Sequence, residues 1–240
     1  MCCLFDATVK FWRRLTDLNQ GARRAVQRQL EGIPSVFDQD IGTVVISAVG
    51  CGLTHVHVHV KAEVPLVLIP AGVTFLPANA AVQKMVTLCV APIRTNRMGA
   101  VPIPAACLEM RRTEPEQGDT LKVLPPSNSG LSPDLGRLVE QIQVELSTSL
   151  LARIRQKTFG RLATYYDPDV MMFDICGREQ FRIFQFAIWI LTDIPHRNGF
   201  VGINSRHLSG DPRPTNQDYR DIKALFARAG VECSSYHAFQ

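Results

Sequence analysis

Three histidines alternate with valines along one short stretch of the sequence. His55, His57 and His59 stand two residues apart, so on a β-strand their side chains would share one face. Imidazole nitrogen is a common metal ligand, but the outer two histidines lie about 13 Å apart along a strand. A metal site would therefore need two neighbouring histidines and a third ligand, which no His-Glu-x-x-His motif or second histidine pair supplies. A half-exposed strand with its valines in the core, a metal site and a pH-sensing face are the three interpretations, and we expect no bound metal or other cofactor.

A single glutamine interrupts the most apolar segment of the chain. Residues 181–191 are hydrophobic apart from Arg182 and Gln185, and a helix that is hydrophobic all round is surrounded by protein. A buried carboxamide without hydrogen-bond partners costs about 1–3 kcal/mol. Gln185 is therefore expected to have a specific polar partner, of which a nearby loop backbone is the simplest.

The glutamine also belongs to a motif. The five residues from Gln185 to Trp189 resemble the Gln-x-Ala-x-Trp segment of bacterial surface thioester domains. The chain further resembles an uncharacterised bacterial family that is similar to those domains and joins a β-rich half to a helical half. The resemblance covers about residues 41–237 and leaves the N-terminal arm outside. It is carried, besides that motif, by four segments: Pro70-Ala71-Gly72, Ala106-Cys107-Leu108, Leu191-Thr192-Asp193 and Ala229-Gly230-Val231.

The resemblance implies a specific chemistry. Cys107 would be the thiol and Gln185 the acyl donor of an internal thioester, which forms with loss of ammonia and which an amine or hydroxyl nucleophile can open. Phe184, Phe186 and Trp189 would shield that bond from water. Phe184 stands where surface thioester domains usually have threonine.

Other roles remain open for the same cysteine. On a β-strand, Cys107 is also typical of a small buried hydrophobic residue. An activating base is not evident, and His196 and His237 are the nearest candidates by position. Cys107 or Cys176 could instead be a protease-like nucleophile, but neither lies in a protease signature. The cysteines are odd in number and scattered, which argues against a disulfide framework; they stand at positions 2, 3, 51, 89, 107, 176 and 233.

These residues lie in two halves of the chain that differ in residue composition and pattern. Residues 41–111 contain short β-branched segments separated by glycine and proline, which is typical of an antiparallel sandwich or meander. We expect a small immunoglobulin-like β-layer followed by, and packed against, a helical layer, in an α+β fold. The expected strands are 43–47, 53–60, 66–69, 73–75, 82–93 and 100–108.

The second half is predicted to be helical. Residues 112–134 are rich in proline, glycine and serine and predict a connecting loop. The helical part, 135–240, begins with a helix capped by Ser132 and contains the buried helix 179–191. Its last helix starts at about 214–215, where Thr215 and Asp218 resemble a capping box, and stops at Gly230.

The N-terminal part, residues 1–40, is expected to form a basic amphipathic helical arm. Arginines alternate with apolar residues over 8–31, a pattern that suits docking on the core of this protein, on a partner or on a membrane surface.

Composition limits the possible partners. The chain has 240 residues and a formal charge of +4, too small a charge to favour nucleic acid. It has no apolar run of about 18 residues that would span a membrane. The first residues do not resemble a signal peptide, so the expected compartment is the cytoplasm, or the cell exterior if a leader precedes the given sequence.

These observations favour a non-enzymatic recognition module of thioester-domain-like ancestry that binds an unknown protein. The alternatives are a reactive module whose Cys107–Gln185 thioester couples to an amine-bearing partner, and a histidine metal site on the β-layer.

Overall fold

The computed structural model describes residues 18, 20–28, 30–50, 55–96, 98–116, 118–157, 177–192 and 214–239, apart from the side chains of 148–157 and 178. Cys2, Cys3, Cys51, Cys176 and His196 therefore lie outside the described residues, as do residues 1–17, 19 and 29 of the predicted N-terminal arm. A helix at 18–30 comes before the strands and further helices come after them, so the α+β prediction is confirmed.

Six antiparallel strands close into a barrel, and two more form a separate ribbon. The order around the barrel is β1-β2-β7-β5-β4-β8, and β3 pairs with β6. Their bounds are β1 Val45–Gly50, β2 His55–Lys61, β3 Leu66–Ile69, β4 Thr74–Pro77, β5 Met85–Thr87, β6 Ala91–Arg94, β7 Val101–Cys107 and β8 Thr120–Leu124.

The alternating pattern of β2 has the predicted effect on burial. Val56, Val58 and Val60 are completely buried, whereas His57 and His59 are half-buried on the opposite face. His55 differs from the expected half-exposed face, because it is buried where it pairs with Pro104 of β7.

The prediction that residues 112–134 are only a connecting loop was wrong. Strand β8 lies within that segment and pairs with β1 on one side and β4 on the other, so it closes the barrel. The strand is only five residues long between segments rich in turn-forming residues, and its alternation is too short to stand out from them. A closed barrel replaces the sandwich or meander expected for 41–111, and the β-rich part extends beyond residue 111 to the end of β8 at Leu124.

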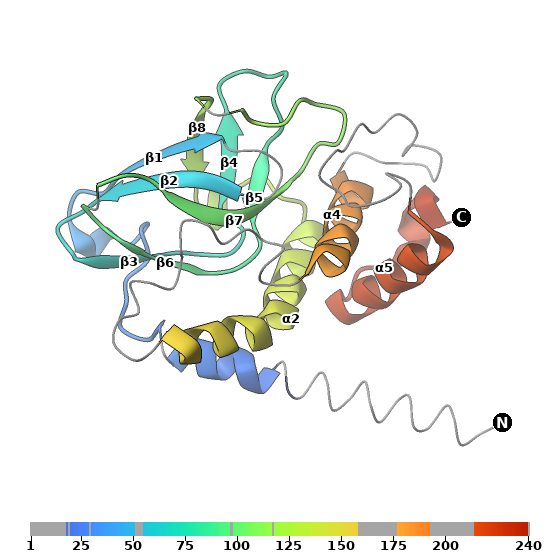
Figure 1. The fold of residues 1–240 in the computed structure, drawn as a ribbon. Coiled ribbons are helices and arrows are strands. Elements are labelled where there is room, and N and C mark those ends of the chain that lie inside the picture. Colours follow the sequence, from blue (N-terminus) through green and yellow to red (C-terminus); the bar gives the residue numbers. More distant parts are fainter. Residues whose placement is uncertain are drawn as a thin grey trace.

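Three long helices form the second layer (Figure 1). They are α2 Pro133–Lys157, α4 Arg178–Thr192 and α5 Asn216–Ala229. The helices contact one another, and α4 also contacts β7 of the barrel. Helix α4 therefore joins the two layers.

The predicted helix ends are confirmed. The hydroxyl of Ser132 accepts the Leu135 N–H at 3.3 Å at the start of α2. Thr215 and Asp218 form a reciprocal capping box at the start of α5, and Gly230 ends that helix with a φ of 68°, which a glycine adopts without a steric cost.

The N-terminal arm is helical where it is described, at 18, 20–28 and 30. Ala22, Val26 and Leu30 are buried in the common core, whereas Arg24 and Arg28 are exposed on the opposite side. This helix lies beside the end of α2 (Figure 1), and Arg23 pairs with Glu140 of α2 at 2.9 Å. No described helix is both long and apolar enough to cross a membrane.

Candidate functional site

The structure brings Cys107 and Gln185 together at the seam between barrel and helices. Cys107 is the last residue of β7, and Gln185 lies in the middle of α4; both are completely buried. The Cys107 N–H donates to Gln185 Oε1 at 3.1 Å, and Gln185 Nε2 donates to the Cys107 carbonyl at 2.7 Å. The buried glutamine thus has the polar partner that its surroundings require.

The Gln185 carboxamide makes the two hydrogen bonds that a neighbouring strand would otherwise make with Cys107. The end of β7 is hydrogen-bonded to β5 on one side, where the Leu108 N–H donates to the Lys84 carbonyl at 2.9 Å. Successive residues of a strand alternate the side to which their N–H and C=O point, so the backbone groups of Cys107 face away from β5. On that side β2 pairs with β7 only as far as His55, opposite Pro104. The Gln185 amide, with one donor and one acceptor, completes the hydrogen bonds of Cys107.

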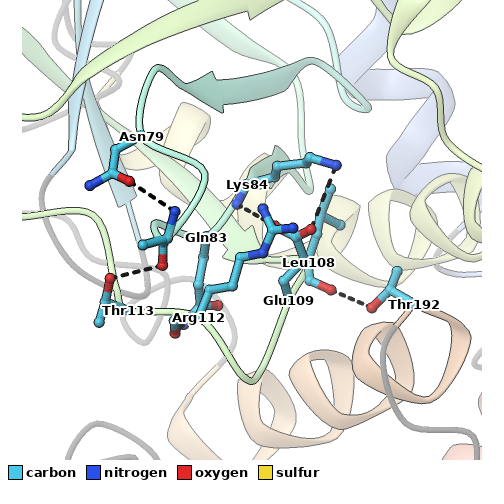
Figure 2. Close-up of polar contacts among 9 residues, drawn as sticks. Asn79, Gln83, Lys84, Leu108, Glu109, Arg112, Thr113 and Thr192 are labelled. Carbon is cyan, nitrogen blue, oxygen red and sulfur yellow. Dashed lines mark hydrogen bonds and ion pairs between the residues drawn. The ribbon is translucent and has the colours of Figure 1, made fainter.

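A second residue of α4 fastens the same strand end. The Thr192 hydroxyl bonds the Leu108 carbonyl, as Figure 2 shows, and also lies 2.9 Å from the Ile188 carbonyl of its own helix. Residues 185 and 192 are seven apart, about two helical turns, and so lie on one face of α4. Sequence reasoning gave Thr192 no role, although it belongs to the Leu-Thr-Asp segment of the family resemblance.

The chain beyond β7 is held by a local polar network (Figure 2). Glu109 pairs with Lys84 Nζ at 3.6 Å and with Arg112 at 3.2 Å. Gln83 Nε2 donates to the Arg112 carbonyl at 2.8 Å, and Thr113 donates to the Ala81 carbonyl at 3.0 Å. Segments 79–84 and 108–113 are thereby fixed to each other, which holds the Cys107 end of β7 in place.

The environment of the thiol keeps it protonated. Burial, and secondarily the negative charge of Glu114, raises the pKa of Cys107 well above its usual value. The thiolate is the nucleophilic form of cysteine, so the raised pKa lowers the fraction of Cys107 in that form. Of the two bases considered, His196 lies outside the described residues, and His237 is exposed on the short helix η6 His237–Phe239.

The three aromatic residues predicted to shield the pair are buried on helix α4. Phe184, Phe186 and Trp189 are each at most 1% exposed. The rings of Phe186 and Trp189 lie 6.0 Å apart, and the Arg182 guanidinium lies 4.7 Å from the Phe186 ring centre. The indole N–H of Trp189 is buried and has no hydrogen-bond partner among the described residues.

The histidines of β2 are placed side by side but not as a ligand set. The rings of His55 and His57 have centroids 5.4 Å apart. Burial, and secondarily the charge of His57, lowers the pKa of His55. Within the described parts of the chain, no group of three or more His, Cys, Asp or Glu residues is arranged to hold a metal ion.

Comparison with known proteins gave no family model, no curated protein and no solved structure that matches this chain. The functional argument therefore depends on the geometry described above.

Proposed function

We propose that this protein is a non-enzymatic recognition module in which Cys107 and Gln185 fasten the helical layer to the β-layer. The observation that carries the proposal is the pair of hydrogen bonds between the Gln185 carboxamide and the Cys107 backbone. Both polar atoms of the amide are used to join the layers. A buried, protonated thiol beside them is consistent with a structural role.

The β-layer is proposed to be a derivative of an immunoglobulin-like layer. Antiparallel pairing throughout its sheets supports this relationship. Closure of six strands into a barrel is the feature in which it would have diverged.

The proposed partner is a protein that carries an acidic surface, and the docking face is the exposed side of the helix at 18–30. Arg24 and Arg28 lie one helical turn apart there, and with Gln27 and Glu31 they line a shallow groove. The apolar side of this helix is already buried on the core, so the partner would be bound mainly by charge. Such binding should weaken as salt is raised.

Binding of a glutamate-rich peptide tests this face. Wild-type protein should bind it in a salt-dependent manner, and the double variant Arg24→Glu/Arg28→Glu should not. The double variant Arg24→Lys/Arg28→Lys keeps the charge and is the matched control. Equal binding by the wild type and the charge-reversed variant would refute the proposed face.

A reactive module is the second candidate, and the hydrogen bonds between the Gln185 amide and the Cys107 backbone support it. The Cys107 sulfur would attack Gln185 Cδ, the C–N bond would break and ammonia would leave with the thiol proton. An amine would then attack the same carbon, and Cys107 would leave as a thiol. This route requires a Gln185 amide released from the Cys107 backbone and a thiol whose pKa is lowered.

The intact mass of the purified chain separates the two candidates. We expect the mass of the unmodified sequence, unchanged by methylamine. The reactive module would be established instead by a mass lower by one ammonia, a loss that Cys107→Ser abolishes. Methylamine would then add at Gln185 and raise the mass to one CH₂ above that of the unmodified sequence. Cys233→Ser is the control, because that half-buried cysteine lies outside the seam.

A further inference from the structure

A cavity lies between the N-terminal helix and its neighbours, away from the Cys107–Gln185 pair. Its volume is about 180 Å³. The helix at 18–30, β3, the residue before β6 and helix α2 each contribute to its wall. The apolar part of that wall consists of Val26, Leu30, Leu68 and Val90, and the polar part includes Arg23 and Ser147.

The size suits a small molecule. An apolar cavity of about 150 Å³ is large enough to bind benzene, so this one can take a body of about six carbon atoms. Four aliphatic side chains, from the helix at 18–30, from β3 and from the residue before β6, line it, and such walls favour an apolar body.

One polar atom in the wall lacks a partner. Arg23 Nε is buried and makes no hydrogen bond with any described residue. A buried donor without an acceptor is unfavourable, so an acceptor brought by a ligand would remove that cost. By contrast, the Ser147 hydroxyl already donates to the Gln143 carbonyl at 2.7 Å, so it does not need an acceptor from a ligand.

The charge near Arg23 favours an anion. Arg23 pairs with Glu140, but the Glu140 side chain is 63% exposed, and an exposed ion pair contributes little stability. A carboxylate at Arg23 can therefore compete with Glu140 and form a bidentate pair with the guanidinium.

We propose that this cavity binds a short-chain carboxylate, with its apolar chain among Val26, Leu30 and Leu68 and its carboxylate at Arg23. The site does not involve Cys107 or Gln185, and it shares the helix at 18–30 and Gln27 with the acidic-partner face. The proposed ligand is therefore a small molecule with a short apolar chain and one carboxylate.

Titration of the full chain with hexanoate, followed by methyl NMR, tests the proposal. Saturable shifts of the methyl groups of Val26, Leu30 and Leu68 are expected. From butanoate to hexanoate, affinity should rise about fourfold for each methylene, because burial of one CH₂ contributes about 0.8 kcal/mol. Hexan-1-ol should bind several-fold more weakly than hexanoate.

Variants identify the groups that bind. Arg23→Lys keeps the positive charge but removes the two parallel N–H donors of the guanidinium, and should lose the preference for hexanoate over hexanol. Arg24→Lys lies outside the cavity and should keep that preference. Glu140→Gln should tighten hexanoate binding by releasing Arg23. Ser147→Leu should fill the cavity and prevent binding, with circular dichroism as the check that it folds.

The proposal is overturned if hexanoate produces no saturable shifts at these methyl groups. It is also overturned if affinity is independent of chain length, or if hexanol binds as well as hexanoate. If Ser147→Leu does not fold, Arg23→Lys and Glu140→Gln still test the proposal. Arg23→Lys is expected to weaken hexanoate binding, whereas Glu140→Gln is expected to tighten it.

Discussion

The carboxamide of Gln185 holds both backbone groups of Cys107, at 3.1 Å and 2.7 Å, in the buried seam between β7 and α4. The contact uses the main chain of residue 107. Its contribution to stability therefore depends on the side chain at 185 much more than on the side chain at 107.

Substitution of Gln185 should be strongly destabilising. Gln185→Leu replaces the carboxamide with an apolar side chain of similar size and leaves the N–H and C=O of Cys107 without the amide as partner. Each such buried group costs about 1–3 kcal/mol, and we expect a total loss of roughly 2–4 kcal/mol in urea unfolding. Cys107→Ser keeps both backbone bonds and should lose less than about 1.5 kcal/mol. Equal losses in the two variants would contradict the assignment.

The variant Gln185→Glu should make stability depend on pH. A protonated glutamic acid can still accept from the Cys107 N–H and donate to its carbonyl, but burial disfavours the carboxylate. The folded-state pKa of this residue would be raised above the usual value of about 4.3. The variant should thus be most stable below about pH 4 and lose stability as the pH rises through the folded-state pKa, whereas the wild type should lack this loss.

Part of this seam could be predicted from the sequence. The surroundings of Gln185 predicted burial and a polar partner, and the family resemblance joined it to Cys107. The role of Thr192 was not predictable, because a threonine near a helix end is common and its partner, the Leu108 carbonyl, lies 84 residues away. Barrel closure was missed for a similar reason: β8 pairs with β1 over about 70 residues of sequence separation, and local patterns do not encode such pairings.

Acid should destabilise the protein through His55. Its folded-state pKa is lowered by burial and by His57, so protonation favours the unfolded chain. The stability that neutral His55 contributes is fully present above the unfolded pKa of about 6.5 and is lost as the pH falls toward the lower folded-state pKa. We expect a slope of at most about 1.4 kcal/mol per pH unit in that window. His55→Gln should reduce the slope there, and His57→Gln should reduce it in part; an unchanged profile in His55→Gln would contradict this prediction.

Two glycines offer a matched test of packing. A Cβ at Gly50 in β1 would lie 2.4 Å from the Pro115 Cβ and 2.9 Å from the Glu116 carbonyl oxygen. Gly50→Ala should therefore cost about 1–3 kcal/mol. A Cβ at Gly136 in α2 would meet nothing within 4 Å, so Gly136→Ala should stabilise by up to about 1 kcal/mol. Thermal unfolding measures both; a neutral Gly50→Ala would show that segment 115–116 moves freely.

The last prediction is that the two layers depend on each other for folding. A chain ending at residue 119 lacks β8, which leaves both β1 and β4 without a neighbour that they have in the barrel. It also lacks Gln185, so the backbone of Cys107 loses its partner. A fragment of residues 125–240 retains α4, whose side chains Phe184, Phe186 and Trp189 are covered in the whole protein, but lacks β7, which α4 contacts.

We therefore expect neither fragment to show a cooperative thermal transition or dispersed NMR signals. A fragment of residues 1–126 is the control for β8: it restores the closed barrel but not the seam, and should gain strand signal in circular dichroism without reaching the stability of the whole chain. Mixing the 1–126 and 125–240 fragments should recover part of that stability, and Gln185→Leu in the second fragment should abolish the recovery. An apolar helix can unfold cooperatively only when other elements cover it. A cooperative transition in the 125–240 fragment alone would therefore show that the other helices cover α4 and that it does not need the barrel.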